Sequence, residues 1–198
     1  FADNELWFWS LFIAGSITML LGAISALRYF DLKALLAYAT VSQLGILVML
    51  LAFDNKYAYI AVCVGILAHA LYKGPLFMMA GIIDHATGTR DIRKLAALWR
   101  PLPWVAAVGL IAGLSMAGIP PLFGFLAKET LLEALYEVGI HSEVVGWIGF
   151  GLAAIAGAFF VGYSFTLLWE TFLRKTPADE PAAGVHHAPS FAFVLAPL

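Results

Sequence analysis

Long hydrophobic segments alternate with short polar connections along most of the chain. Crossing about 30 Å of hydrocarbon requires a helix of roughly 20 residues. Five segments reach that length, at about residues 6–29, 33–53, 57–83, 102–138 and 144–172. Lipid requires each backbone polar group to be bonded within the protein, and the alternation of barrel strands is absent from these segments. The pattern therefore predicts an all-α polytopic membrane protein with five transmembrane helices.

The fourth segment is too long for one straight helix. Its 37 residues would extend about 55 Å, far beyond the thickness of a bilayer. It contains the stretch "GIPPLFGFLAKE", in which two prolines remove backbone donors and two glycines loosen the chain. We expect two half-helices, at about 102–117 and 125–138, with the fourth helix broken at 118–125. The residues of this break are Gly118, Pro120, Pro121 and Gly124.

Lys128 follows the break directly, and two interpretations of it stay open. Broken helices at membrane depth are typical of the ion sites of secondary transporters, and Lys128 would then meet water inside the membrane. Alternatively, the helix ends at Gly118, and the following segment lies on the outer face with Lys128 as an interfacial anchor. Glu129 and Glu133 would suit such a solvated face.

The third segment also carries a charge, since Lys73 lies in its middle. A lysine there costs roughly 2.5 to 3.5 kcal/mol on insertion scales, so it should face a partner or a wet interior. His69 lies one turn earlier on the same helix face, and two such groups could pass a proton along a hydrated row. The alternative is a buried pair that neighbouring helices satisfy, for rigidity only.

The second segment adds further polar candidates. Lys33 stands at its start beside Asp31, where a role in proton entry competes with that of a basic residue at the membrane edge. Thr40, Ser42 and Gln43 lie within the segment, and we expect them to hydrogen-bond across helices.

Composition supports the membrane class. The chain has 198 residues, of which 62% are hydrophobic and 12% charged, whereas about a quarter are charged in soluble domains. The net charge of −2 gives no reason to expect a nucleic-acid partner. The single cysteine, Cys63, excludes an internal disulfide, and the adjacent His186 and His187 have no further ligand nearby. We therefore expect neither a metal site nor a cofactor.

Basic residues are distributed unequally between alternate connections, which predicts the orientation. One side receives eight Lys and Arg residues and the other at most two, Lys56 and Lys128. The first set is Arg28, Lys33, Arg90, Arg93, Lys94, Arg100, Arg174 and Lys175. We expect residue 1 outside and the connections at 28–33, 84–100 and 170–190 in the cytoplasm.

The end of the chain differs in composition. Residues 177–198 begin as a Pro- and Ala-rich polar linker and end in an apolar stretch that could start a further transmembrane helix. Residues 1–176 form one unit with the five predicted spans. The chain also starts without a methionine, so we expect it to be part of a longer protein.

Three stretches, "DLKALLAYATVSQLG", "HALYKGPLFMMAGIIDHATGTRDIRKL" and "MAGIPPLFGFLAKE", carry a resemblance in this order and spacing. They resemble the antiporter-like membrane family, which includes the large subunits of Mrp-type Na⁺/H⁺ antiporters and the proton-pumping subunits of complex I and related hydrogenases. "GIIDHATGTRDIRKL" and the lysine at position 128 resemble the Mrp A subunit most.

This resemblance implies two inverted five-helix repeats with one broken helix each, of which this chain resembles the second. It implies a proton-translocating row of Lys73 and His69, with Lys128 as the terminal lysine and Lys33 as a further charged position. Many members carry a second histidine where this chain has Gly65.

The implied protein is part of an ion transporter rather than an enzyme. It would sit in a prokaryotic cytoplasmic membrane, with the other subunits of a multisubunit complex and the lipid bilayer as partners and H⁺ and Na⁺ as transported ions. Three functions stay open. They are cation/H⁺ antiport, proton pumping in a redox-driven complex, and a structural membrane role without its own ion path.

Overall fold

The computed structural model describes residues 4–140, 144–174 and 185. These residues form helices joined by connections, the longest at 88–102, and one isolated β-bridge links two of the connections. The helices are α1 (Glu5–Arg28), α2 (Leu32–Leu50), α3 (Lys56–Thr87), α4 (Pro103–Ala117), α5 (Phe123–Ile140) and α6 (Val144–Leu168), which continues into a π-helix, η1 (Trp169–Leu173). The predicted all-α class is confirmed. The predicted linker and further helix at 177–198 lie outside the described residues, apart from Val185.

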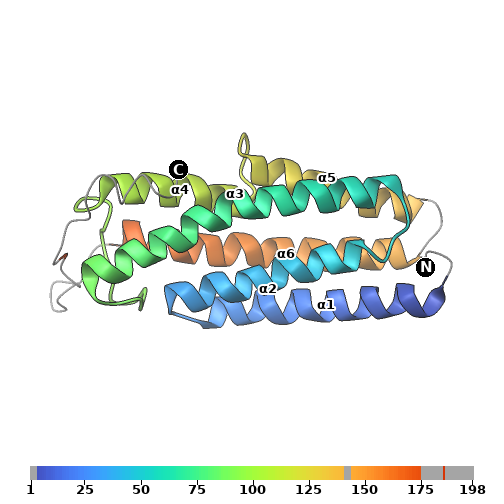
Figure 1. Cartoon of the computed structure of the whole chain (residues 1–198), viewed down its shortest axis with the longest axis horizontal. Helices are drawn as coiled ribbons and strands as arrows, with labels where there is room; N and C mark the ends of the chain where they lie inside the picture. Colours follow the sequence, from blue (N-terminus) through green and yellow to red (C-terminus); the bar gives the residue numbers. More distant parts are fainter. Residues whose placement is uncertain (1–3, 141–143, 175–184, 186–198) are drawn as a thin grey trace.

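The helices run lengthwise through an elongated bundle, and α4 and α5 follow each other along one traverse (Figure 1). Among the described helices, four are long and apolar enough to cross a membrane: α1, α2, α3 and α6 with η1. α4 is apolar but shorter. The interruption predicted at 118–125 is present, although α5 resumes at Phe123, two residues earlier than expected. That α4 and α5 together make a fifth crossing stays a prediction.

Side chains at the helix ends explain where several helices begin and stop. The side chains of Asn4, Asp31 and Asn55 accept hydrogen bonds from backbone N–H groups in the first turns of α1, α2 and α3. These contacts satisfy donors that have no partner within the helix. α3 ends at Gly88, whose φ of 69° lies in the left-handed region that favours glycine.

α1 and α2 pack with their backbones almost in contact. A Cβ added to Gly22 would lie 2.8 Å from the Cα of Ser42, and one on Gly45 would lie 2.8 Å from the Cα of Met19. The Ser42 hydroxyl donates to the Met19 carbonyl at 2.8 Å, as expected for a polar group that bonds across helices. Small residues allow this close approach between helices in lipid, where packing rather than hydrophobic burial drives association.

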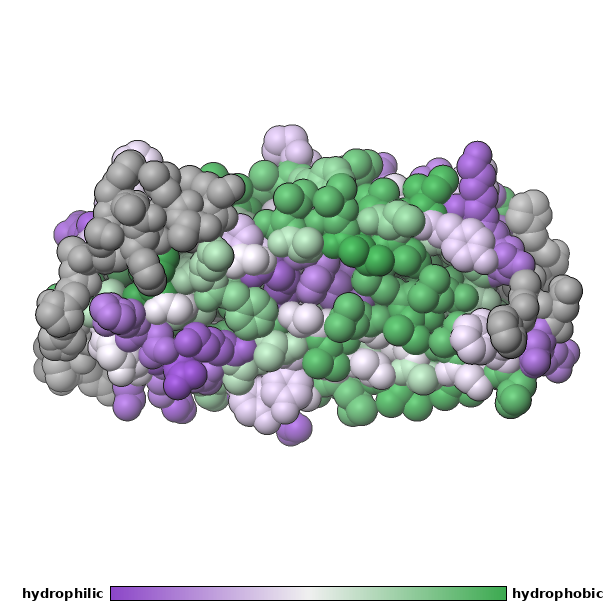
Figure 2. Space-filling model, in the orientation of Figure 1, coloured by the Kyte–Doolittle hydropathy of each residue, from purple (hydrophilic) through white to green (hydrophobic). Residues whose placement is uncertain are grey.

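The outer surface of the bundle is apolar. Large hydrophobic side chains remain exposed on several helices, for example Leu21 at 61%, Ile111 at 60% and Phe165 at 61%. On the face shown in Figure 2, hydrophilic side chains gather towards the two ends, with hydrophobic ones between them. A small hydrophilic patch also lies in the middle of this face. A lipid-facing surface accounts for the apolar band, whereas the central patch requires a separate explanation.

One end of the bundle collects most of the basic residues. An antiparallel bridge joins Asp31 to Asp91 there, through hydrogen bonds from Leu32 N to Arg90 O (2.9 Å) and from Ile92 N to Phe30 O (2.8 Å). The Arg93 guanidinium bonds the Asp91 carboxylate and lowers its pKa, so this pair stays ionised at neutral pH. The basic connections thus share one end, as their alternation predicted. The side of the membrane that this end faces stays a prediction.

Candidate functional site

The connection between α4 and α5 is a compact turn. Gly118 ends α4 with a φ of 81°, and its N–H donates to Leu114 O and Ser115 O. The Gly124 N–H at the start of α5 donates to the Ser115 hydroxyl at 3.2 Å, which ties the second half-helix to the end of the first. Pro120 and Pro121, joined by a cis peptide bond, occupy the tip of the turn.

We expect Gly124→Ala to destabilise this connection, because an added Cβ would overlap the Ser115 carbonyl oxygen. Forcing extra volume against backbone typically costs about 1 to 3 kcal/mol, which thermal unfolding should report as a lower Tm. Gly151→Ala is the matched control, because a Cβ at that α6 position meets no atom within 4 Å. Equal Tm values for the two variants would contradict the close packing described here.

Lys128 turns inward from the second turn of α5. Its ammonium donates to the Ala117 carbonyl at the end of α4, with 2.5 Å between nitrogen and oxygen, and lies 5.1 Å above the centre of the Phe160 ring of α6. The Gly118 N–H bonds the carbonyls of Leu114 and Ser115, whereas the Ala117 carbonyl accepts from Lys128, and the negative end of the helix dipole favours a cation there. The π face of Phe160 adds to this stabilisation.

The helix that carries Lys128 packs inside the bundle rather than beside it. α5 packs against α3 and α6 and lies lengthwise in the bundle (Figure 1). α4 extends about 22 Å, and Lys128 lies five residues into α5, so its backbone falls near the middle of the α4–α5 traverse. Lys128 thus lies near the middle of the bundle's length, and its position at membrane depth stays a prediction.

Lys73 is almost entirely buried, with 5% of its surface exposed. Its ammonium donates to the Leu36 carbonyl of α2 at 2.9 Å, and the Thr40 hydroxyl donates to the same oxygen at 2.9 Å. Thr40 thus bonds its own helix, and the expectation that it bonds across helices is wrong. The charge of Lys73 is held by one neutral carbonyl among the described residues, which is a costly arrangement for a purely structural lysine.

His69 lies one turn before Lys73 and is half-buried. Its ring packs edge-on against Tyr72, with 5.6 Å between the ring centres. Its Nδ1 is buried and has no hydrogen-bond partner among the described residues. Buried imidazole nitrogens are usually bonded to protein or to water, so this nitrogen is available to a water or to a group beyond the described chain.

Lys33 lies away from these residues, at the basic end of the bundle. Its ammonium pairs with Asp84 of α3 at 3.1 Å, and Arg90 approaches the same carboxylate at 3.4 Å. The Lys33 side chain is 39% exposed, so this pair contributes little to stability. The structure therefore brings Lys33 to the basic end of the α2–α3 interface, where its ion-pair partner is Asp84 rather than a group near Lys73.

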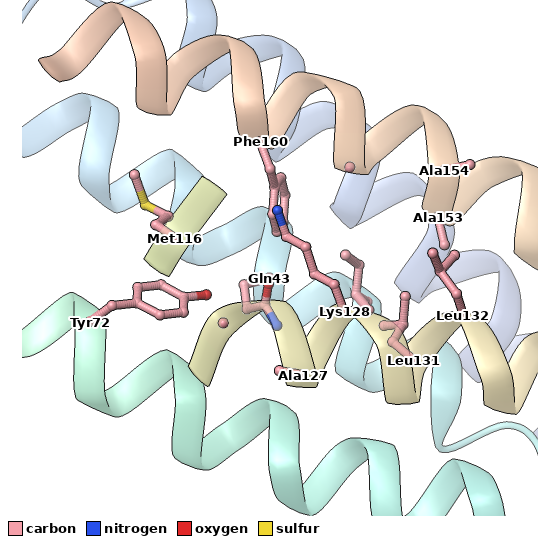
Figure 3. A pocket seen from close by; sticks show the side chains of 13 residues that line it. Gln43, Tyr72, Met116, Ala127, Lys128, Leu131, Leu132, Ala153, Ala154 and Phe160 are labelled. Atoms are coloured by element: carbon pink, nitrogen blue, oxygen red, sulfur yellow. The ribbon is translucent and has the colours of Figure 1, made fainter. Parts of the chain in front are cut away.

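A cavity of about 250 Å³ lies beside Lys128, between α2, α3, α5 and α6 (Figure 3). Most of its wall is apolar, and its polar lining comes from the side chains of Gln43, Tyr72 and Lys128. The site predicted from the sequence did not include Gln43 and Tyr72. A glutamine within an apolar span and a tyrosine next to Lys73 could have indicated that they belong to it. The expected hydrogen bond from Gln43 to another helix is absent among the described residues.

A second, more open hollow of about 620 Å³ also has Lys128 in its wall. Its wall includes Gly118, Phe125, Glu129, Glu133 and Tyr136. Lys128 and Leu132 contribute to the walls of both spaces, so the inner cavity and this outer hollow adjoin at Lys128. In the described part of the chain, no three His, Cys, Asp or Glu residues gather as metal ligands would.

Comparison with known proteins identifies a family. The family model described as "NADH:quinone oxidoreductase/Mrp antiporter, TM" matches residues 1–155. The A subunit of the Na(+)/H(+) antiporter of Alkalihalophilus pseudofirmus is 41% identical over 207 residues, covering 96% of this chain and 26% of that protein. The A/B subunit of a probable K(+)/H(+) antiporter of Rhizobium meliloti is 42% identical over 180 residues, covering 91% of this chain and 18% of that protein.

Two solved structures contain chains that are similar to this one in fold and in sequence. The Mrp complex from Dietzia sp. contains a chain that is 35% identical, with a TM-score of 0.81 over 99% of this chain and 21% of its own length. Respiratory complex I from Thermus thermophilus contains one that is 26% identical, with a TM-score of 0.79 over 96% of this chain and 38% of its own length. The chain thus spans about a quarter or less of the curated relatives named here. It is a multi-pass membrane protein that belongs to the NADH:quinone oxidoreductase/Mrp antiporter family of membrane proteins.

Proposed function

We propose that the chain is part of the proton-translocating machinery of a multisubunit Na⁺(cation)/H⁺ antiporter. Protons move along a hydrated row formed by His69, Lys73 and Lys128 in the middle of the membrane. The observation that carries this proposal is the position of Lys128, which bonds the end of α4 at the break in the helix and lines both the inner cavity and the outer hollow.

The geometry at Lys128 suits a group that takes up and releases a proton. The free carbonyl at the end of α4 and the Phe160 ring stabilise the charged form. The inner cavity and the outer hollow offer two routes by which a proton can reach or leave the amine. A lysine that lines two such spaces can exchange with each in turn, as alternating access requires.

Lys73 serves as the buried carrier, with His69 as a relay one turn away. A charge held by a single neutral carbonyl is weakly compensated, so little binding free energy opposes the loss of its proton. The free Nδ1 of His69 can accept a hydrogen bond from water or from a protonated neighbour. Coulombic coupling in the low-dielectric interior then links the charge states of neighbouring carriers.

Lys33 is the proposed point of proton entry, because it stands where α2 and α3 meet at the basic end of the bundle. That end faces the cytoplasm in this proposal, in agreement with the distribution of Lys and Arg. Sodium binds elsewhere in the assembly. A hard cation prefers oxygen ligands, and the nearest acids to the break, Glu129 and Glu133, line the outer hollow rather than the inner cavity.

A second candidate function is proton pumping in a redox-driven complex. It is favoured by the likeness to chains of complex I and of the membrane-bound sulfane sulfur reductase, a respiratory membrane complex, the latter with a TM-score of 0.80 at 25% identity. The same row of carriers would serve either function, and only the driving reaction differs.

Vesicles that contain the whole protein with its partner subunits separate the two functions. An imposed pH gradient should collapse when Na⁺ is added, without any electron donor, because antiport needs only the two ion gradients. Vesicles from cells that lack the protein are the control. Proton movement that appears only with an electron donor and a quinone would instead establish the redox-driven function.

A further inference from the structure

The two buried lysines are held by different helices. Lys73 donates to Leu36 O on α2, whereas Lys128 donates to Ala117 O on α4. Among the described residues that line the inner cavity beside Lys128, neither Lys73 nor His69 is present. A proton that moves between these carriers therefore needs other groups to cross the intervening space.

Gln43 of α2 is one polar group that lines the inner cavity. It follows Leu36 by seven residues, which puts both on the same face of α2. Its amide nitrogen would lie 3.9 Å from a Cβ built on Gly65, so the amide reaches over α3 at a point where α3 has no side chain. The residue is only 8% exposed, and it lines the inner cavity.

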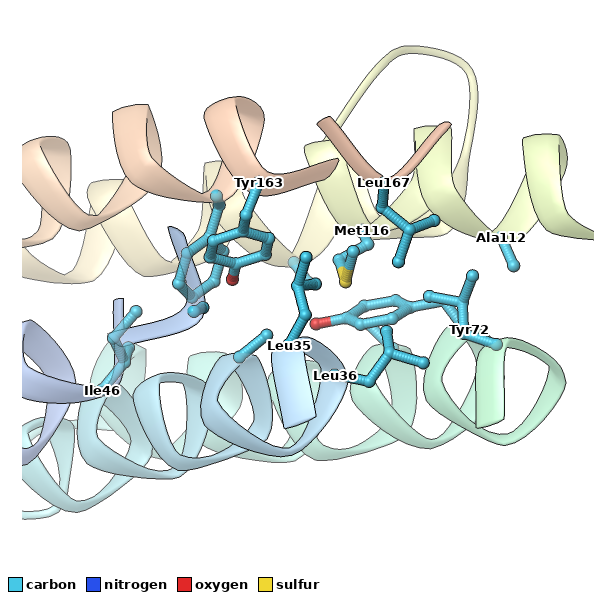
Figure 4. Close-up of a cluster of buried hydrophobic side chains, with 14 of the residues drawn as sticks. Leu35, Leu36, Ile46, Tyr72, Ala112, Met116, Tyr163 and Leu167 are labelled. Carbon is cyan, nitrogen blue, oxygen red and sulfur yellow. The ribbon is translucent and has the colours of Figure 1, made fainter. Parts of the chain in front are cut away.

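Tyr72 presents a second polar group to the same cavity. The residue is 6% exposed, and its ring packs in the apolar cluster with Leu36 and Met116 (Figure 4). Its hydroxyl is directed towards Gln43 in the view of Figure 3, and Tyr72 lines the inner cavity.

The polar side chains of Gln43 and Tyr72 face one cavity together with Lys128, and such a lining favours water. Ordered water in a protein cavity typically makes about three hydrogen bonds to polar groups of the wall. A volume of about 250 Å³ accommodates several waters, and three polar side chains supply the partners that such waters need.

We propose that the Gln43 amide and the Tyr72 hydroxyl hold ordered water in the inner cavity and thereby connect Lys73 with Lys128 for proton transfer. Both are positioning residues, since they orient the water and do not carry the proton themselves. This inference rests on the proposed function and adds residues to its path.

Hydration of the cavity can be measured without any transport assay. Radiolytic hydroxyl labelling oxidises methionines next to bound water, and Met116 lines this cavity although it is only 1% exposed. Met19 is the matched control, because it is 0% exposed and packs between α1 and α2, away from the cavity. We expect labelling of Met116 well above that of Met19, and a marked decrease in the Gln43→Leu variant. Equal labelling of the two methionines would show a dry cavity and overturn the proposal.

Two substitutions at Gln43 separate hydration from packing. Gln43→Leu keeps most of the volume but removes the polar atoms, and we expect exchange to fall by at least about tenfold, because proton transfer depends on close alignment. Gln43→Ser loses volume but keeps a hydroxyl and room for water, so it should retain most of the exchange. Normal exchange in Gln43→Leu, or equal losses in the two variants, would overturn the proposal.

Tyr72→Phe removes only the hydroxyl and should slow exchange, with a larger ratio of rates between H₂O and D₂O than in the unaltered protein. Tyr38→Phe is the control, since Tyr38 stacks on Tyr29 and does not line the cavity. A normal rate and isotope ratio in Tyr72→Phe would exclude its hydroxyl from the path. If Lys128→Arg abolishes exchange while the Gln43 and Tyr72 variants stay active, this inference fails and the proposed function stands.

Discussion

Replacing Lys128 with arginine is expected to abolish cation/H⁺ exchange while the protein stays folded and assembled. Arginine keeps the positive charge that pairs with the Ala117 carbonyl and the Phe160 ring. It does not release its proton under physiological conditions, because its guanidinium stays charged within proteins. The variant therefore preserves the electrostatic contacts at the break and removes only the ability to pass a proton on. Exchange at matched expression, measured in membrane vesicles, checks this expectation.

Two further variants complete this test. Lys128→Met removes both the proton and the charge at the end of α4, so it should lose exchange and also lower the Tm. Lys56→Arg, at the start of α3, should leave exchange unchanged. Full exchange in Lys128→Arg would mean that the charge at this position suffices, as for a structural cap or a surface anchor.

Lys73→Met is expected to eliminate exchange without lowering the stability of the fold. Burying an ammonium costs free energy that one carbonyl bond only partly offsets, and an apolar side chain of similar length fits the same space. The Leu36 carbonyl keeps the hydrogen bond from the Thr40 hydroxyl when the lysine is absent. Thermal unfolding should therefore give an unchanged or higher Tm, whereas vesicles should show no exchange.

A structural role for Lys73 leads to the opposite pair of results. The Tm would fall in Lys73→Met, and the surviving folded protein would still exchange ions. Leu76→Ala calibrates the stability assay, because removing a fully buried leucine side chain typically costs about 2 to 5 kcal/mol.

The break in the fourth segment could be predicted from the sequence because it depends on local chemistry. Two prolines remove donors and Gly118 adopts a left-handed conformation, and both effects act within a few residues. Hydrophobic length likewise predicted the long helices, because the bilayer sets that length directly.

The partners of the buried lysines could not be predicted in this way. Which carbonyl meets Lys73, or which ring lies beside Lys128, depends on how each helix is rotated and on which helices are neighbours. Those choices come from packing, such as the close contact of α1 and α2 at Gly45, and a single sequence does not encode them in any local pattern. Thr40 illustrates the limit, because its hydroxyl bonds to its own helix.

The central claim is that Lys128 itself carries a transferable proton, and a rapid Na⁺ pulse tests it most directly. Proton release from vesicles containing the assembled protein would be followed with a pH-sensitive dye in a stopped-flow instrument. In the unaltered protein we expect an initial burst of proton release followed by steady exchange. In Lys73→Met we expect the burst alone, because Lys128 can release its proton but receives no further proton from position 73. Lys128→Arg should show neither phase. A burst of undiminished size in Lys128→Arg would contradict the account, since the released proton would then come from another group.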